Sequence, residues 1–346
     1  MPGLPERPTD AQDSCDPRPP PLRDGQGRTV DYLRLSLTER CNFKCGYCTP
    51  PDSRLDGESL TAEELVRLVA VFAPLGVRRE DAVLRLADWG EPLLRRDVLE
   101  IARGIKSVPG IAELAMTTNG HLLESMAEAL LDAGVTRLNI SLDSLDPARF
   151  RRLTGGAGSL DRLLASIDAC LAARFDDLKL NTVVLRGENE GEAASLIRYA
   201  WSKGMVVRFI ECMPFARGTP VPTLELVERI RRDGIALRPE SEVSGSAPSG
   251  PSEYWLGQGG RVGFIGPLSR NFCSSCNRVR VASNGDLRAC LGGTQVVPLA
   301  RLLRGENAEA ELSRAVRAAL QRKPEHHQMT LPDAGHKLLS MRNIGG

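Results

Sequence analysis

The chain has 346 residues, 42% of them hydrophobic, and its 45 basic and 44 acidic residues give a net charge of +1. This length supports one barrel-sized core, or one core with an appended lobe. The balanced net charge gives no global sign of a nucleic-acid or anionic-membrane partner, so any basic site must be local. No apolar run approaches the roughly 20 residues of a membrane-spanning helix. We therefore expect no nucleic-acid or membrane partner. We also expect a cytoplasmic protein, because free cysteines suit the reducing interior of the cell.

The first 28 residues are rich in proline, with Pro17 and Pro19 to Pro21 close together, and show little apolar periodicity. Such a segment cannot bury enough apolar surface to fold, so residues 1–28 are predicted to be a disordered leader. The segment also lacks the apolar stretch of a signal peptide.

From Tyr32 to about Ile210, short apolar runs alternate with helical patterns, which is typical of β/α units around a parallel sheet. The predicted strands are Tyr32–Ser36, Ala82–Ala87, Glu113–Thr117, Arg137–Ser141, Lys179–Val184 and Val206–Ile210. The predicted helices are Ala62–Phe72, Arg96–Lys106, Leu122–Asp132, Leu160–Ala173 and Glu192–Ser202. Thr61 and Glu64 form a capping box before the first helix, and Gly134 supplies a left-handed residue after the third.

Six strand–helix passes are fewer than the eight of a closed barrel, so residues 29–213 predict an α/β fold, an incomplete (β/α)6 barrel of the TIM type. Functional residues should gather at the carboxyl ends of its strands. Residues 214–332 are predicted to form a C-terminal extension over the open side, followed by a tail at 333–346. The elements predicted in the extension are a hairpin of Tyr254–Leu256 and Arg261–Ile265, strands Val279–Ala282 and Leu287–Cys290, and helices Pro298–Leu303 and Ala308–Arg322.

Six of the nine cysteines fall into two triplets with ligand-like spacing. The triplets are Cys41-x3-Cys45-x2-Cys48 and Cys273-x2-Cys276-x13-Cys290. Three thiolates can hold a four-iron cluster that leaves one iron open to a ligand. Structural zinc, the alternative, needs four closed ligands, and none of the four histidines lies near a triplet. Disulfide frameworks belong to short secreted chains. The spacing therefore favours two iron–sulfur clusters.

The first triplet lies in the run Cys41-Asn42-Phe43-Lys44-Cys45-Gly46-Tyr47-Cys48, which resembles the cluster loop of radical S-adenosylmethionine (SAM) enzymes. Three further segments indicate which family of radical SAM enzymes the chain resembles. They are Leu33-Arg34-Leu35-Ser36, Asn271-Phe272-Cys273-Ser274-Ser275-Cys276-Asn277-Arg278-Val279-Arg280 and Met341-Arg342-Asn343-Ile344-Gly345-Gly346. Together these segments resemble the GTP 3′,8-cyclase family of molybdenum cofactor biosynthesis, from about Gly27 to the last residue.

The resemblance implies a radical SAM barrel with two [4Fe–4S] clusters. The first triplet would hold the catalytic cluster, which binds SAM and releases a 5′-deoxyadenosyl radical. The second triplet would hold a cluster that binds the guanine of GTP. The product would be (8S)-3′,8-cyclo-7,8-dihydroguanosine 5′-triphosphate. The family further implies an electron donor such as flavodoxin or ferredoxin, a downstream cyclic pyranopterin monophosphate synthase, and a homodimer.

A triphosphate needs cationic side chains, and Arg278 and Arg280 alternate along one face of a predicted strand. The residues expected to contact GTP are Arg34, Arg85, Lys179, Arg208, Arg278 and Arg280. Those that the resemblance implies for SAM are Tyr47, Gly90, Glu91, Thr117, Asn119, Ser141 and Met213. Taken singly, each also has an ordinary interpretation as a surface charge, a turn residue or core filler. Gly345 and Gly346 are implied to enter the active site and activate it.

The segment Leu86-Ala87-Asp88-Trp89-Gly90-Glu91-Pro92 departs from the Thr-Gly-Gly-Glu-Pro run usual in the family. Trp89 stands in place of a glycine, which we expect to alter the turn or the affinity for SAM, because glycine admits a ligand close to the backbone. Thr49 stands where the family usually has methionine, a smaller change.

Two other functions remain open. A radical SAM enzyme acting on a peptide or another substrate would keep the radical chemistry but would be expected to carry more than the three cysteines that residues 214–332 contain. A non-catalytic zinc or iron–sulfur regulator would carry a basic helix or a helix-turn-helix segment, and the sequence offers neither.

Overall fold

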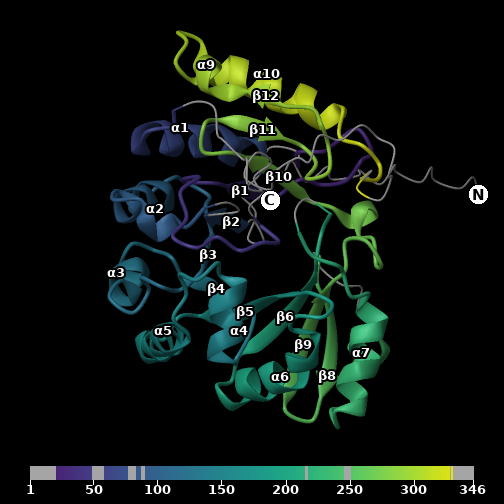
Figure 1. Ribbon diagram of the computed structural model, residues 1–346. Coiled ribbons are helices and arrows are strands. Elements are labelled where there is room, and N and C mark those ends of the chain that lie inside the picture. Colours follow the sequence, from purple (N-terminus) through teal and green to yellow (C-terminus); the bar gives the residue numbers. More distant parts are fainter. Residues whose placement is uncertain are drawn as a thin grey trace, which may run out of the picture.

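The computed structural model describes residues 21–48, 58–76, 83–86, 90–214, 217–244, 251–327 and 329. Within these residues, twelve strands form one sheet in the order β12-β11-β10-β1-β2-β3-β4-β5-β6-β9-β8-β7. Helices α1, α2, α3, α5 and α6 follow one another along the outer side of this sheet (Figure 1). No helix in the described ranges is long and apolar enough to cross a membrane.

The first six strands are parallel and adjacent in chain order. They are β1 (Tyr32–Leu35), β2 (Val83–Leu86), β3 (Glu113–Thr118), β4 (Arg137–Ser141), β5 (Asp177–Val184) and β6 (Val206–Glu211). These bounds confirm the predicted strands to within two residues at either end. The six strands do not pair with one another to close a ring, because β1 pairs on its other side with β10 and β6 with β9. The incomplete barrel is therefore confirmed.

The helices between these strands shield their outer face. They are α1 (Ala62–Phe72), α2 (Val98–Lys106), α3 (Ala127–Asp132), α4 (Pro147–Leu153), α5 (Leu160–Ala173) and α6 (Ala193–Ser202). The capping box of α1 is confirmed, since the Thr61 hydroxyl accepts from the Glu64 N–H at 3.2 Å and the Glu64 carboxylate accepts from the Thr61 N–H at 2.9 Å. Gly134 has the predicted left-handed backbone, with φ +92°.

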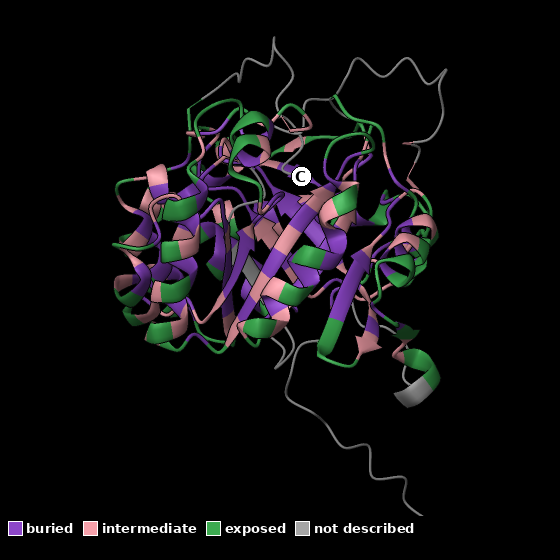
Figure 2. Cartoon of the chain, turned by 60° about the horizontal axis from the view of Figure 1, so that its bottom comes forward, coloured by how far each residue is buried: buried purple, intermediate pink, exposed green. Residues whose placement is uncertain are grey.

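Alternation along the strands separates a dry outer face from a polar inner one. In β5, Leu178, Leu180 and Val184 are buried, while Lys179 and Asn181 between them line an interior cavity. Successive side chains of a strand point to opposite faces, so one face packs on helices and the other is left for polar groups. Figure 2 shows the same contrast, with buried residues concentrated in the central strands and exposed residues on the outer helices.

The later part of the chain extends the sheet at both edges. Its elements are α7 (Thr223–Arg232), β7 (Arg238–Pro239), α8 (Ser241–Ser244), β8 (Glu253–Gly257), β9 (Gly260–Ile265), β10 (Arg278–Val281), β11 (Asp286–Arg288), β12 (Val297–Pro298), α9 (Leu299–Leu303) and α10 (Ala308–Gln321). The predicted hairpin is confirmed as the antiparallel pair β8 and β9, in which Gly257 opposes Gly260.

The predicted leader is wrong for residues 21–28, which are ordered. Leu22 and Asp24 are 1% and 3% exposed, and Val30 donates its N–H to the Leu22 carbonyl at 2.8 Å. The Gly25 N–H bonds to Leu320 at 3.1 Å. The burial of this segment depends on the far end of the chain, which local composition does not reveal. Residues 1–20 lie outside the described ranges.

Other boundaries also differ from the prediction. Helix α3 begins at Ala127 instead of Leu122, because residues 121–126 form turns after β3. Strand β11 ends at Arg288, so Cys290 lies in the loop that follows it. Helices α4 and α7 were not predicted, although Leu226, Val227 and Ile230 of α7 form a buried stripe. That spacing is the usual signal of an amphipathic helix.

Candidate active site

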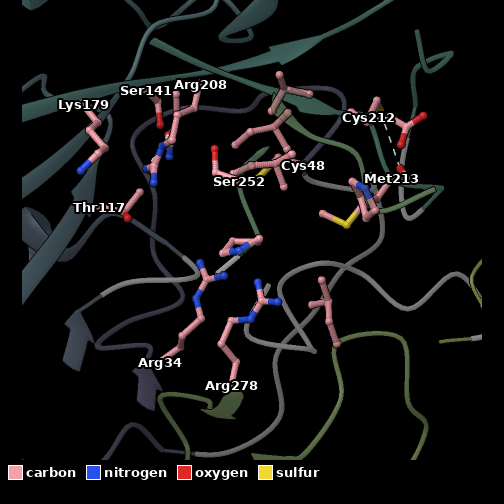
Figure 3. A pocket seen from close by; sticks show the side chains of 18 of the residues that line it. Arg34, Cys48, Thr117, Ser141, Lys179, Arg208, Cys212, Met213, Ser252 and Arg278 are labelled. Carbon is pink, nitrogen blue, oxygen red and sulfur yellow. Dashed lines mark hydrogen bonds between the residues drawn. The ribbon is translucent and has the colours of Figure 1, made fainter. Parts of the chain in front are cut away.

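A cavity of about 940 Å³ opens at the carboxyl ends of the parallel strands. All six triplet cysteines line it, as do side chains from β1, β3 to β6, β9 and β10. Figure 3 shows Arg34 and Arg278 entering from one wall, with Lys179, Ser141 and Arg208 on the facing wall and Met213 to one side. The two cysteine loops, 232 residues apart between Cys41 and Cys273, therefore share one chamber.

The first triplet lies on the loop that follows β1, and this loop is tied to its surroundings by its backbone. The Lys44 N–H donates to the Thr154 carbonyl at 3.1 Å, and the Cys48 N–H donates to the Cys45 carbonyl at 3.0 Å. The Phe43 ring packs edge-on against Phe150, with the ring centroids 6.2 Å apart. Phe43 thus anchors the loop in the core and leaves the flanking cysteines at the cavity.

Gly90 and Glu91 lie against this loop and against the end of β3. Gly90 has φ +70°, and a Cβ built there would lie 2.2 Å from the Thr38 carbonyl oxygen, so the position requires glycine. The buried Glu91 carboxylate accepts from the Thr118 hydroxyl at 2.8 Å and from the Asn119 N–H at 2.7 Å. Burial raises the pKa of Glu91 to about 7, although these donors pull the pKa down.

Tyr47, the aromatic residue of the cysteine loop, is fixed by a buried carboxylate. Its hydroxyl donates to Asp143 Oδ2 at 2.6 Å, and the other carboxylate oxygen accepts from the Val183 N–H at 2.9 Å. Burial raises the pKa of Asp143 to about 6, and burial together with the Asp143 charge raises the pKa of Tyr47 well above its ordinary value. The pair links the cysteine loop to the ends of β4 and β5.

The second triplet surrounds the start of β10. The Cys273 N–H donates to Asn271 Oδ1 at 2.7 Å, and the Cys276 N–H donates to the Cys273 carbonyl at 3.1 Å, which forms a short 3-10 turn. Burial tends to raise the pKa of Cys276, but the positive charges of Arg278 and Lys323 outweigh it and lower the pKa to about 6. The lowered pKa favours the thiolate form of Cys276, and the thiolate is the form in which cysteine binds metals.

The cysteines of both triplets are suited to binding iron–sulfur clusters. All six triplet thiols are free and line the cavity, with Cys273 and Cys276 before β10 and Cys290 in the loop after β11. In the described part of the chain, no three His, Cys, Asp or Glu side chains are close enough to hold one metal ion together. In a four-iron cluster held by three thiolates, each thiolate binds a separate iron, and each triplet supplies three such thiols.

Cations concentrate on one wall of the cavity. Parallel pairing sets Arg34 of β1 in register with Arg280 of β10 on one side and with Arg85 of β2 on the other. Arg278, two residues before Arg280 on the same face, is 5% exposed, lies 4.7 Å from the Phe272 ring centroid and has no hydrogen-bond partner for its Nε among the described residues. A buried guanidinium with an unused donor suits an anionic ligand.

The facing wall carries Lys179 and Arg208. Arg208 donates to Asn181 Oδ1 at 2.7 Å and also to Asn139. Burial lowers the pKa of Arg208 from its usual value. Lys179 is bonded to Asp177, yet burial lowers its pKa to about 8. Two cations therefore face the arginines of β1 and β10 across the cavity.

Every predicted site residue with a described side chain lies at this cavity. Those lining it are Arg34, Cys41, Cys45, Tyr47, Cys48, Gly90, Glu91, Thr117, Asn119, Ser141, Lys179, Arg208, Met213, Cys273, Cys276, Arg278, Arg280 and Cys290. Arg85 lies on β2, but its side chain is outside the described set, as are Thr49, Asp88, Trp89, Gly345 and Gly346. The consequence of Trp89 therefore stays a prediction.

Several polar cavity residues were missed by the sequence reasoning, and three of them lie on barrel strands or directly after them. Asp143, Asn181 and Glu211 lie on or just after β4, β5 and β6. For Asp143 and Glu211 the available signal was position, because polar residues at the carboxyl ends of barrel strands tend to be functional. Asn181 also follows Lys179 by two residues, so strand alternation places both on the same face.

Comparison with known proteins agrees with this geometry. Residues 35–200 match the radical SAM superfamily, and residues 205–329 match the family described as Molybdenum Cofactor Synthesis C. The solved structure of SuiB from Streptococcus suis bound to S-adenosylmethionine is similar at a TM-score of 0.60 and 14% identity, over 86% of this chain and 72% of that one. Fold and cysteine loop thus define a radical SAM enzyme.

Closer relatives specify the family. The GTP 3′,8-cyclase of Marinobacter nauticus is 44% identical over 336 residues, which cover 94% of this chain and 98% of that protein. The GTP 3′,8-cyclase of Pseudomonas entomophila is 41% identical over 340 residues, covering 95% and 99%. The chain belongs to the GTP 3′,8-cyclase family.

Proposed function

We propose that this protein converts GTP to (8S)-3′,8-cyclo-7,8-dihydroguanosine 5′-triphosphate, the first step of molybdenum cofactor biosynthesis. One observation carries the proposal, namely that two cysteine triplets and a wall of arginines line the same cavity. Family membership supports it, since relatives that span nearly the whole chain are named for this reaction. The Molybdenum Cofactor Synthesis C match covers residues 205–329, which contain the second triplet.

The first triplet would hold a [4Fe–4S] cluster, which, when bound, supplies the electron that cleaves SAM to methionine and a 5′-deoxyadenosyl radical. Nearby residues would position SAM. Asn119, whose N–H is fixed by Glu91, places its amide nitrogen 3.9 Å from Cys41 Sγ. Tyr47, held by Asp143, and Met213 on another wall would enclose the rest of the cofactor, together with Thr117 and Ser141 at the strand ends.

The second triplet would hold a further [4Fe–4S] cluster that takes the guanine, and the cations would hold the triphosphate. Arg34, Arg278 and Arg280 would supply planar donor groups suited to phosphate oxygens. Lys179 and Arg208 on the facing wall, and Arg85 on β2, would complete the binding of the nucleotide. Gly345 and Gly346 are proposed to enter this cavity and activate it.

The electron balance of the reaction requires an electron donor. The radical removes the hydrogen atom from C3′ of GTP, and the resulting C3′ radical adds to C8 of guanine. One unpaired electron then remains on the base, so a second electron and a proton complete the product. A reduced flavodoxin or ferredoxin is proposed as the donor of both electrons. A cyclic pyranopterin monophosphate synthase would consume the product, and we propose a cytoplasmic homodimer.

The decisive experiment is anaerobic reconstitution of the full chain with iron and sulfide, followed by incubation with SAM, a reductant and GTP. We expect about eight irons per chain, formation of 5′-deoxyadenosine that depends on GTP, and a cyclised nucleotide detected by mass spectrometry. Retention of zinc, a single cluster, or 5′-deoxyadenosine formation unaffected by GTP would each contradict the proposal.

The role of the arginine wall has its own test. Arg280→Ala should weaken GTP binding by at least tenfold while the iron content stays unchanged, because a charge-assisted bond to phosphate contributes about 1.5–3 kcal/mol. Arg270→Ala serves as the control, since Arg270 pairs with Glu253 at 2.8 Å and does not line the cavity. Equal GTP affinity in both variants would refute the assignment.

A further inference from the structure

The N-terminal hairpin, residues 22–30, lies directly behind the second cysteine loop. The Arg28 guanidinium donates from Nη1 to the Cys273 carbonyl at 2.7 Å. It also donates to the carbonyls of Pro324 and Glu325 at 2.8 and 3.0 Å. One side chain from the start of the chain therefore binds both the cysteine loop and the segment that follows α10.

A second cation reaches the same loop from the other end of the chain. Lys323, two residues after α10, is 2% exposed. Its ammonium group donates to the Cys276 carbonyl at 3.0 Å and to the Arg278 carbonyl at 2.9 Å. Two of the three cysteines of the triplet thus have their carbonyl oxygens bound by a cation, Cys273 by the partly buried Arg28 and Cys276 by the buried Lys323.

Asp24 joins these two cations. Its carboxylate is fully buried, lies 2.7 Å from Arg28 Nε and 3.7 Å from Lys323 Nζ, and accepts the Arg28 N–H at 3.0 Å. Gly25 beside it packs so closely that an added Cβ would lie 2.2 Å from the Gln321 carbonyl oxygen. We call Asp24, Arg28 and Lys323 the clasp.

Two physical arguments separate the clasp from ordinary packing. Burying three charges costs several kcal/mol per ion, and apolar side chains of similar size would usually stabilise a fold at least as well. The clasp also has a net charge of +1 behind thiolates that bind iron as anions. The reduction potential of an iron–sulfur cluster depends on nearby charge, hydrogen bonding and solvent access.

Building on the proposed function, we propose that Arg28 and Lys323, oriented by Asp24, are positioning residues of the second cluster. They fix the carbonyl groups of its cysteine loop, and their excess positive charge favours the reduced cluster. The N-terminal hairpin is then part of the active-site architecture and not a leader.

The test uses the anaerobically reconstituted full chain and measures iron content and the reduction potential of each cluster by electron paramagnetic resonance. The signal that SAM perturbs is assigned to the first cluster. In Lys323→Gln we expect the second cluster to shift to a more negative potential, or to be lost while the first cluster is retained. Lys323→Arg, which keeps the charge, should restore a potential close to that of the wild type.

The matched control is Lys106→Gln, because Lys106 also donates to a carbonyl, that of Ala112 at 2.8 Å, but at the end of α2. It should change neither potential. Unchanged potentials in Lys323→Gln, or equal loss of both clusters, would overturn the proposal. If that variant does not fold, Arg28→Gln is judged by the same criteria, and failure of both to hold either cluster also overturns it. A wild-type chain with about four irons would instead refute the proposed function itself.

Discussion

At the scale of single residues, Gly90 gives a sharp prediction about the loop beside the first triplet. Gly90→Ala should destabilise the protein by about 2–5 kcal/mol, the sum of the left-handed backbone cost for alanine and the overlap with the Thr38 carbonyl, 2.2 Å from the added Cβ. Chemical unfolding under anaerobic conditions measures this change. Iron content should fall in parallel, because the Glu91 N–H next to it bonds to Arg40 in the cysteine loop at 2.8 Å.

Gly156 is the matched control. It also has a positive φ, +87°, but an added Cβ would meet nothing within 4 Å. Gly156→Ala should therefore cost only about 1–2 kcal/mol. Equal destabilisation of the two variants would show that the close approach at Gly90 is relieved at little cost.

Glu91 predicts a pH dependence of stability. Burial raises its pKa to about 7 from an ordinary value of 4.5, so the folded chain binds this proton more tightly than the unfolded chain does. The associated stabilisation is complete below about pH 4.5 and is lost as the pH rises through about 7. The contribution of Glu91 to the free energy of unfolding therefore falls by about 3 kcal/mol between the low and the high end of this pH range.

Glu91→Gln removes the titrating group and should flatten this slope. Asp143, whose pKa burial raises to about 6, contributes a slope of the same sign but is present in both proteins, so their difference isolates Glu91. Urea midpoints between pH 4.5 and 7.5 provide the measurement. Parallel curves for the two proteins would contradict the assignment.

Much of the site could be predicted, the cysteine triplets from their spacing and the cations from their strand positions together with the family resemblance. The cysteines, Arg34, Lys179, Arg208, Arg278 and Arg280 all line the predicted chamber. What spacing could not predict is the network beneath them. Asp24 bonds to Arg28 nearby but also approaches Lys323, 299 residues further along the chain, and only the folded chain brings these three charges together.

At the scale of elements, the cap of α1 gives a quantitative prediction. The Thr61 hydroxyl satisfies the Glu64 N–H, and Glu64 also pairs with Arg304, after α9, at 2.6 Å. Thr61→Ala should lower the free energy of unfolding by about 1 kcal/mol. Ser125→Ala is a control, since this exposed hydroxyl bonds only weakly, at 3.3 Å, within the turns before α3. A change equal to that of the control would show that the cap contributes nothing.

Helices and strands could be predicted where the apolar residues kept one periodicity along the whole element. The six parallel strands, with their β-branched and leucine-rich runs, were found to within two residues. Helix α7 has a strongly polar outer face, including Arg229, Arg231 and Arg232, which hid its narrow apolar stripe. Helix α3 was predicted too long because Leu122 and Leu123 continue its apolar pattern back into turns. The local pattern of apolar residues does not show where tertiary contacts end a helix.

At the scale of the whole molecule, the pairing of the later strands with the edges of the barrel was beyond prediction. Strand β10 comes 67 residues after β6 along the chain, yet it pairs with β1 at the opposite side of the barrel. That pairing sets Arg280 beside Arg34 and brings the second triplet to the chamber of the first. Pairing over such separations depends on global packing, for which the sequence has no short-range signal.

The continuous sheet leads to a prediction about the two halves that the family matches divide. Because β1 pairs with β10 and β6 pairs with β9, a fragment of residues 1–213 would leave both edges of its parallel sheet unpaired. Parallel sheets are normally protected, and unpaired edges promote association between chains. We therefore expect the fragment to aggregate, and co-expression with residues 214–346 to restore a defined species on size-exclusion chromatography. A fragment that is monomeric and unfolds cooperatively would show that the first six strands are an independent domain, and that the second half covers a barrel it does not help to build.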